Sequence, residues 1–370
     1  MSYGVIKVSS RRELKDFINL PFKIYKNYKN WVAPIKSELK RTLDVKKNPY
    51  FRFASLDLFN CYLNKKNVAR ISLSVNETYC KSAGVRTGFF GFFEAFNDPD
   101  AVKFLFDELF KYCKANGIQR IEGPYNPNLY SEVGMLCTKY DLPPSFFQTY
   151  NPEYYNSLLK ENGFNILEVL HTRINKDSSG YLNKEFSKAL ELKLKDLSVR
   201  SFDMRNKEAD LEHLRNIFND AFSDNWHFTP VSKDEYLFAS KHLELVTPPD
   251  LLQFVEYKAE PVAAVHFVLD INPLLKNFKG RSSLIKYLNF LIQRKNIERV
   301  LIFAVGIKKD FRNSRVVQLL FNASVQIARK CSILESTWMY DENKIIISLA
   351  ERLGLERDKE FNIYYKDLPS

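Results

Sequence analysis

One acidic residue lies where its side chain could accept a proton. Glu335 follows Ile333 and Leu334 in a short apolar run that predicts a buried strand. Burial among apolar side chains disfavours the charged form of a carboxyl group and so makes it a stronger base. Glu335 is therefore a candidate general base. The alternative is a structural carboxylate held in an ion pair.

Other residue types that perform chemistry give weaker patterns. Trp226 and His227 are adjacent in a predicted loop where a substrate could enter, although a lone histidine is more often a surface or packed residue. The five cysteines include no Cys-x-x-Cys spacing, which predicts neither a zinc site nor a disulfide framework and indicates a reducing compartment. No Ser-His-Asp order, phosphate-binding P-loop or metal-spaced cluster is present, so the sequence predicts no bound metal.

The overall charge narrows the classes of partner. The chain has 370 residues and a formal net charge of +11, which attracts nucleotide-like cofactors, phospholipid head groups and nucleic acid alike. The charge is spread and no nucleic-acid-binding module is recognisable, which argues against nucleic acid. No run of 18 or more apolar residues is present, and the start leads into a strand-like run rather than a secretion signal. We therefore expect a cytoplasmic protein, with peripheral association at the inner membrane left open.

The elements that must position these residues follow one order in each half: strand, helix, hairpin, long strand, helix, strand, helix, strand. Helix starts are clear, because Ser10–Glu13 has the capping-box pattern and Asp98 can cap a helix whose first residue is Pro99. The polar stretch Asn175–Gly180 is the best linker candidate. In the second half, strands are predicted over Leu197–Phe202, Leu252–Tyr257, Pro261–Leu269, Arg299–Val305, Ile333–Trp338 and Phe361–Tyr365, and helices over Leu211–Phe222, Ser314–Arg329 and Asn343–Leu353.

The repeat is visible in the spacing of matching elements. The helix starts at Asn151 and Asn343 are offset by 343 − 151 = 192 positions, and the hairpin turns around Asn64 and Lys258 have nearly the same offset. Two copies of one module explain this spacing, and the alternative is a coincidence of common α/β elements. We predict two α/β domains, 1–176 and 186–370, each with a mixed, mostly antiparallel sheet flanked by helices.

Short motifs along nearly the whole chain point to one family. In order they are Asp16–Phe22, Asn30–Pro34, Asn48–Phe51, Gly88–Glu94, Glu122–Pro124, Tyr150–Tyr155, Asn225–Pro230, Asp341–Asn343 and Arg352–Gly354. They resemble a bacterial family of tandem proteins of the GNAT type, which belong to the acyl-CoA N-acyltransferase superfamily. The resemblance implies two GNAT-like domains and an acyl-CoA-dependent reaction.

The resemblance also implies where an acyl-CoA would bind. GNAT proteins hold the pyrophosphate on backbone N–H groups at a helix start, in a (Gln/Arg)-x-x-Gly-x-(Gly/Ala) loop after the long central strand. In this sequence Arg312 matches the loop, whereas Arg315 and Val317 replace its two small residues; extra positive charge could compensate, or the loop could be degenerate. The predicted cofactor-binding set is Ile307, Arg312, Asn313, Ser314, Arg315, Val316, Val317 and Asn343.

The comparable turn of the first half carries Glu94 and Asp98, which would repel phosphate, so that half is expected to be structural or to shape the acceptor site.

Many GNAT proteins have a tyrosine that acts as an acid at the position where this chain has Ala350, so that acid is absent. We predict Glu335 and Tyr364 as the catalytic pair and Trp226 and His227 as acceptor-site residues.

The predicted function is acyl transfer from acetyl-CoA or a longer acyl-CoA to an unidentified amine. A lipid amine is one option, because the basic, aromatic-rich surface suits a lipid acceptor. The alternative is a non-catalytic binding protein of the GNAT fold with a degenerate CoA loop.

Overall fold

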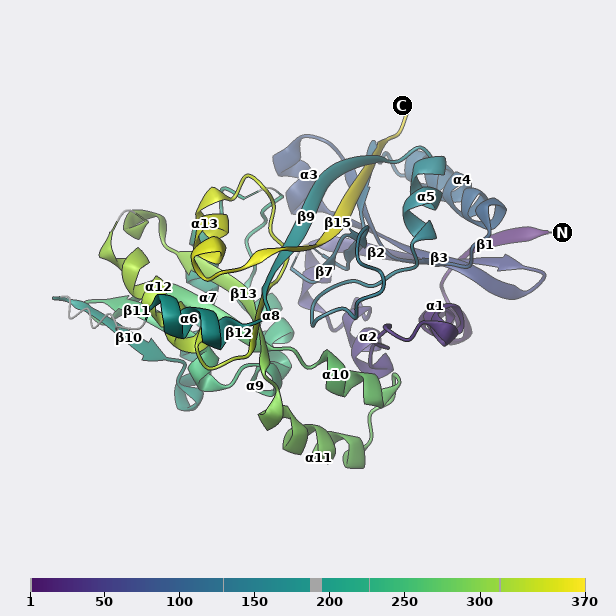
Figure 1. The fold of residues 1–370 in the computed structure, drawn as a ribbon. Coiled ribbons are helices and arrows are strands. Elements are labelled where there is room, and N and C mark those ends of the chain that lie inside the picture. Colours follow the sequence, from purple (N-terminus) through teal and green to yellow (C-terminus); the bar gives the residue numbers. More distant parts are fainter. Residues whose placement is uncertain (1, 129, 187–194, 226, 313, 370) are drawn as a thin grey trace. The chain divides into compact units, whose positions relative to one another are not determined.

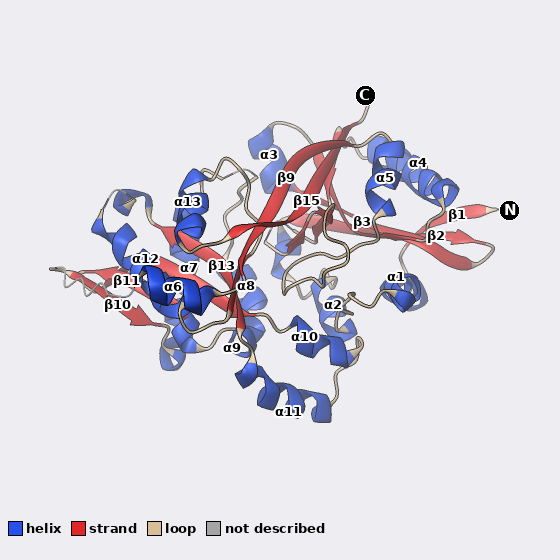
Figure 2. Cartoon of the chain, viewed as in Figure 1, coloured by secondary structure: helices blue, strands red, loops and turns tan. Residues whose placement is uncertain are grey.

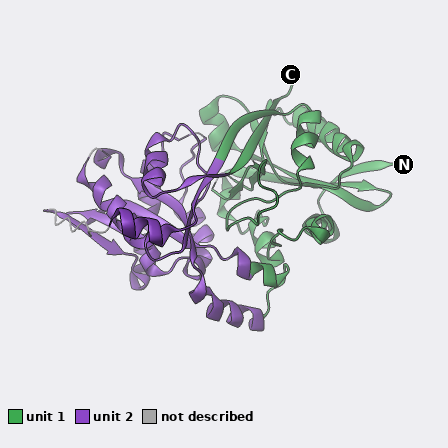
Figure 3. Cartoon of the chain, viewed as in Figure 1, with its two compact units in different colours: residues 1–170, 275–283, 359–370 green, residues 171–274, 284–358 purple. Residues whose placement is uncertain are grey.

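The computed structural model describes residues 2–128, 130–186, 195–225, 227–312 and 314–369 (Figure 1). These residues form two compact units. Unit 1 comprises Met1–Leu170, Leu275–Ser283 and Lys359–Ser370, and unit 2 comprises His171–Leu274 and Leu284–Asp358 (Figure 3). Each unit is a sheet flanked by helices, which confirms the predicted fold class (Figure 2).

The sheet of unit 1 is antiparallel except for one parallel pair, β4 with β5. Its strands, in spatial order, are β1 (Tyr3–Lys7), β2 (Ala54–Leu63), β3 (Lys66–Asn76), β4 (Thr87–Ala95), β5 (Arg120–Gly123) and the end of β15 (Glu356–Asp367). The shorter strands are β6 (Tyr125–Asn126), β7 (Glu132–Val133) and β8 (Met135–Leu136), and the helices are α1 (Arg11–Ile24), α2 (Lys36–Thr42), α3 (Glu77–Ala83), α4 (Pro99–Ala115) and α5 (Tyr154–Glu161).

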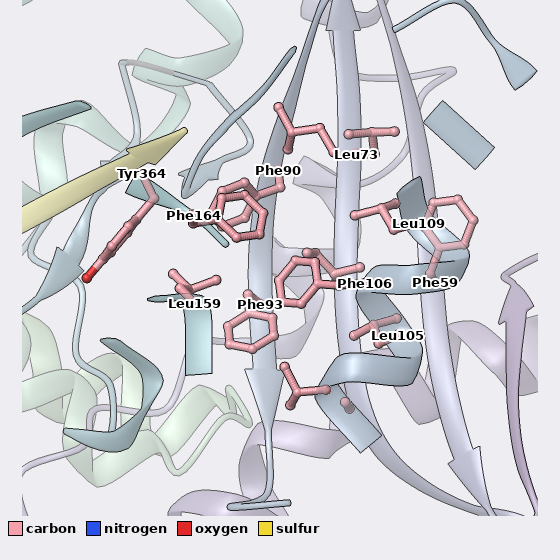
Figure 4. Close-up of a cluster of buried hydrophobic side chains, with 14 of the residues drawn as sticks. Phe59, Leu73, Phe90, Phe93, Leu105, Phe106, Leu109, Leu159, Phe164 and Tyr364 are labelled. Atoms are coloured by element: carbon pink, nitrogen blue, oxygen red, sulfur yellow. The ribbon is translucent and has the colours of Figure 1, made fainter. Parts of the chain in front are cut away.

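Local signals explain where the helices of unit 1 begin. Ser10 caps α1 through a complete capping box with Glu13, and the Asp98 side chain accepts a hydrogen bond from the backbone N–H of Ala101 at the start of α4. The apolar stripe of α4 packs on the sheet in an aromatic core that includes Phe90, Phe93 and Phe106 (Figure 4). Burial of these rings supplies much of the stabilising free energy of the unit.

Unit 2 repeats this arrangement, again with one parallel pair, β13 with β14. Its strands, in spatial order, are β10 (Leu197–Ser201), β11 (Leu252–Tyr257), β12 (Glu260–Leu269), β13 (Arg299–Ile307), β14 (Ile333–Ser336) and the end of β9 (Asn165–Asn175). The helices are α6 (Ser178–Glu185), α7 (Lys207–Ala221), α8 (Lys233–Ala239), α9 (Leu243–Val246), α10 (Asn272–Leu275), α11 (Leu284–Gln293), α12 (Arg315–Ala328) and α13 (Lys344–Arg352). None of the helices described is both long and apolar enough to cross a bilayer.

Helix α7 packs closely on β13 because that strand carries a glycine at the contact. A Cβ atom built on Gly306 would lie 2.6 Å from the Phe218 ring. The core beneath α7 contains Leu214, Phe254 and Ala264. This packing fixes the end of β13 and, with it, the turn that leads into α12.

The compact units do not follow a single cut of the sequence between 176 and 186. The chain enters unit 2 within β9 and returns to unit 1 within β15, whose residues Phe361 and Tyr364 pair with β8 and β5. The stretch predicted as the linker, Asn175–Gly180, runs from the last residue of β9 into α6. Asp177 caps α6 and the hydroxyl of Ser178 donates to the carbonyl of Ala328, so this stretch is packed structure.

Candidate functional site

A helix start follows the central strand of unit 2. β13 ends at Ile307, which pairs with Ala263, and a 3-10 turn (Lys309–Phe311) leads into α12. The Ser314 side chain caps α12 by accepting a hydrogen bond from the N–H of Val316 at 3.2 Å. The first N–H groups of a helix and its dipole attract anions, so this turn has the electrostatics of an anion site.

The side chains at this helix start differ in exposure. Arg315 is exposed and makes no ion pair with a residue that the structure describes, whereas Val316 is buried and Val317 half-buried. Asn313 lies outside the described residues. The branched side chain of Val317 hinders the approach of a phosphate to the backbone more than glycine or alanine would. Arg315 is the residue best placed to compensate, because its positive charge is exposed at the same helix start.

Arg312 has a different partner from the one predicted. Its Nη2 donates to the carbonyl oxygen of Ala221, at the end of α7, over 2.6 Å, and its Nη1 lies 3.7 Å from Asp224. Asp224 also accepts from the Nζ of Lys309 at 2.7 Å. These contacts join the α12 turn to the loop after α7, and Arg312 makes two of them.

The parallel ladder beside this turn is short. β13 pairs with β14 from Arg299 to Ile302, after which Thr337 donates its N–H to the Ile302 carbonyl at 3.0 Å. The ladder of β13 with β12 shifts register just beyond, opposite His266, so that Phe303 falls in a bulge. Among the described residues the β14 ladder does not extend to Ala304 or beyond. This stretch of β13 therefore has a strand edge at which an amide-containing ligand could add hydrogen bonds.

His266 lies beside the bulge, and sequence reasoning missed it. Its Nε2 is 2.9 Å from the hydroxyl of Thr247, and its ring packs edge-on to Phe303 with centroids 5.0 Å apart. Nδ1 is buried and has no hydrogen-bond partner among the described residues. Burial lowers the pKa of His266 to about 3, so the imidazole is neutral at physiological pH. The available signal was a single histidine inside the apolar strand Pro261–Leu269.

Glu335 is buried, as predicted, but it is not surrounded by apolar groups alone. Its carboxylate is 3.4 Å from Nη1 of Arg299, whose Nε is 3.9 Å from Asp270. Glu335 pairs with Leu301 in the parallel ladder, and so it lies before the bulge in the strand. Arg299 thus gives this carboxylate an ion-pair partner on the neighbouring strand.

Tyr364 belongs to unit 1, so the structure gives the two predicted catalytic residues separate surroundings. The Tyr364 hydroxyl donates to Asn156 at 2.7 Å and accepts from Asn362 at 3.2 Å. Figure 4 shows this hydroxyl directed away from the phenylalanine rings of the core. Burial raises the pKa of Tyr364. No described contact places it with Glu335.

The remaining predicted residues lie on turns of unit 2. His227 is half-buried and has a left-handed backbone with φ 56°, in the loop that follows α7, and Trp226 lies outside the described residues. Asn343 caps α13, because its side chain accepts from the N–H of Ile346. The loop of His227 contains Asp224 and is therefore joined to the α12 turn.

The comparable turn of unit 1 has the opposite charge. Asp98 places a carboxylate on the first N–H groups of α4, where an anionic ligand would have to sit. Glu94, at the end of β4, accepts from the Tyr155 hydroxyl at 2.8 Å and lies 3.7 Å from Arg70. Burial raises the pKa of Glu94. The start of α4 therefore carries a charged cap, whereas the cap of α12 is the uncharged Ser314.

No family model matches the chain. Bacterial ceramide synthase of Caulobacter vibrioides is 29% identical over 375 residues, covering 99% of this chain and 97% of that protein. Protein YghO of Escherichia coli is 24% identical over 371 residues, covering 97% of this chain and 94% of that protein. Both similarities extend over the full length.

Two solved structures show the same fold. A tandem GNAT protein from the clavulanic acid biosynthesis pathway matches with a TM-score of 0.56 at 7% identity, over 100% of this chain and 99% of that one. A GCN5-related N-acetyltransferase from Anabaena variabilis matches with a TM-score of 0.54 at 8% identity, over 100% of this chain and 73% of that one. At these identities the likeness concerns the fold.

Proposed function

We propose that this chain, which has the tandem GNAT fold, transfers an acyl group from acyl-CoA to the amine of a lipid. The observation that supports the proposal best is the geometry of β13, whose ladder with β14 ends at Ile302 and whose own end leads through a turn to a helix start with an exposed arginine. The strand edge suits the amide-containing pantetheine arm of acyl-CoA, and the anion-attracting helix start suits its pyrophosphate.

The fit of acyl-CoA to this site can be stated group by group. The pantetheine arm contains two amides, which can hydrogen-bond to the backbone of β13 beyond Phe303. The pyrophosphate carries the negative charge that the α12 amides and Arg315 attract. Arg312 would act indirectly, because its contact with Ala221 holds the turn in place.

The full-length relative supports one class of acceptor. Bacterial ceramide synthase of Caulobacter vibrioides is 29% identical, and its name specifies a product in which a long-chain amine is acylated. We therefore propose a sphingoid-type amine as the acceptor class. The surplus of basic residues would keep the protein near anionic lipid surfaces where such amines reside.

The chemistry requires a neutral amine. The ammonium group loses one proton to a base, and the neutral nitrogen attacks the thioester carbon. The C–S bond then breaks, and the second proton that leaves the nitrogen passes to the departing thiolate, which gives an amide and a thiol. In our proposal Glu335 accepts the proton, and the neutral imidazole of His266 orients the amine through Nδ1. Tyr364 has no contact that supports a part in this step.

The proposal is tested with the full chain in two stages. Thermal shift with acetyl-CoA and palmitoyl-CoA reports binding, and transfer to sphinganine, spermidine and amino acids reports the reaction. We expect the melting temperature to rise with acyl-CoA and an amide product to form with sphinganine. Binding without any product across the amine panel would contradict the catalytic role.

A second candidate function is a non-catalytic acyl-CoA-binding protein. Two observations favour it: Val317 stands where GNAT proteins have a small residue, and Arg312 is bound to Ala221. Acyl-CoA binding without turnover would support this function. A failure to bind any acyl-CoA would contradict both candidates.

A further inference from the structure

Helix α11 has an apolar face that packs on nothing described. Leu284, Ile285 and Ile292 are 73%, 81% and 68% exposed, and Leu288 is exposed as well. Five of the sixteen exposed large hydrophobic side chains of the described residues lie on this ten-residue helix. Scattered apolar residues are normal on a protein surface, but a cluster of this kind marks an interaction surface.

The exposed residues share one side of the helix. At about 100° per residue, Leu284, Ile285, Leu288 and Ile292 fall within an arc of about 100°. Phe290 lies on roughly the opposite side and is buried, and Arg294 just after the helix donates to the carbonyl of Glu244 at 2.6 Å. Unit 2 therefore holds the helix by one side and turns the other outward. We call Leu284, Ile285, Leu288 and Ile292 the α11 apolar face.

The charge around this face has one sign. Between Asp270 and Glu298 the sequence contains no acidic residue and has the basic residues Lys276, Lys279, Arg281, Lys286, Arg294 and Lys295. Lys295, in the 3-10 turn that follows α11, is exposed. Apolar residues on one side of a helix, with lysine and arginine in and around it, are the features of helices that lie in the interface of an anionic bilayer.

We propose that α11 docks the protein on membranes that contain anionic lipids, with the α11 apolar face among the acyl chains and the neighbouring basic side chains at the phosphate groups. A second copy of the chain fits this face less well, because two such helices would bring like charges together. The proposal depends on α11 alone and does not require acyl transfer.

The test uses the full chain and two kinds of vesicle, phosphatidylcholine with phosphatidylglycerol and phosphatidylcholine alone. We expect the wild type to sediment with the phosphatidylglycerol vesicles and much less with phosphatidylcholine, and salt to weaken the binding. The Ile285→Glu/Leu288→Glu variant should bind the anionic vesicles at least about tenfold more weakly, because it places charge in the apolar layer. Lys295→Glu should also weaken binding.

A matched control is available on another helix of the same unit. Ile345, on α13, is 65% exposed, so Ile345→Glu makes the same change outside α11 and should leave vesicle binding unchanged. Both sets of substitutions are at exposed positions, and unchanged thermal melting will confirm that the variants fold. Wild-type protein that stays in the supernatant, or a double variant that binds like wild type, overturns the proposal. So does a dimer of the wild type that becomes monomeric in the double variant.

Vesicle binding and acyl transfer are measured separately. If vesicles bind through α11 but no acyl product forms, the membrane proposal stands and the proposed function fails. If an amide product forms in detergent but α11 variants bind vesicles normally, the proposed function stands and the membrane proposal fails.

Discussion

Arg312 donates from its Nη2 to the backbone carbonyl of Ala221 at 2.6 Å, which joins the turn before α12 to the carbonyl end of α7. A cation at a helix C-terminus interacts favourably with the helix dipole as well as with the carbonyl itself. The arginine that the sequence predicted to hold phosphate thus holds the turn that leads into α12.

The first prediction concerns that contact. Arg312→Ala should lower the free energy of unfolding by about 1 kcal/mol, because it removes a charged hydrogen bond that is partly exposed to solvent. Urea unfolding measures this change. Arg312→Lys should recover part of the loss, and a variant as stable as wild type would contradict the assignment.

Arg315, unlike Arg312, should affect acyl-CoA binding rather than stability. Arg315→Glu replaces an exposed cation at the start of α12 and should weaken acyl-CoA binding at least about tenfold with little change in melting temperature. Lys241→Glu, an equal change of charge at an exposed position elsewhere in unit 2, is the control. Equal acyl-CoA affinity in the two variants, measured by calorimetry, would count against the site.

His266 provides a test of the proposed acceptor site. His266→Ala should reduce kcat for acyl transfer at least about tenfold, because the amine loses the group that orients it. Acyl-CoA affinity should stay nearly unchanged. Thr247→Val, which removes the hydroxyl 2.9 Å from Nε2, should have a smaller effect on kcat. A His266→Ala variant with full activity on a confirmed acceptor would exclude this role.

The same histidine predicts how stability depends on pH. Its folded-state pKa of about 3 is below the ordinary value of 6.5, so the unfolded chain takes up a proton that the folded chain does not. The stability from this group is present above pH 6.5 and is lost as the pH falls toward 3. Wild type should lose about 2 kcal/mol between about pH 7 and pH 5 through this residue. His266→Gln should show a correspondingly flatter profile in urea unfolding.

Glu335 is tested by removing its charge. Glu335→Gln should reduce acyl transfer at least about tenfold and leave acyl-CoA affinity nearly unchanged, as expected for a general base. Because Arg299 contacts the carboxylate, thermal melting must accompany the assay. Normal activity with a lowered melting temperature would make Glu335 a structural partner of Arg299.

Local signals in the sequence were sufficient for much of the fold. The caps at Ser10 and Asp98 and the alternation of apolar residues in the strands depend on neighbours within a few positions, so the elements were predictable. The repeat offset from Asn151 to Asn343 and the short motifs along the chain indicated the tandem GNAT fold. The resemblance to the GNAT loop also placed the turn of Arg315 after the central strand of the second half.

Tertiary structure decided which partners the candidate functional residues have. Arg312 meets a carbonyl 91 positions away, and Glu335 meets Arg299 across two strands, contacts that no local pattern encodes. His266 is neutral because it is buried beside a bulge, where its Nδ1 has no hydrogen-bond partner among the described residues. The α11 apolar face is likewise visible only in three dimensions, because periodicity gives a helix an apolar side without telling whether the fold covers it.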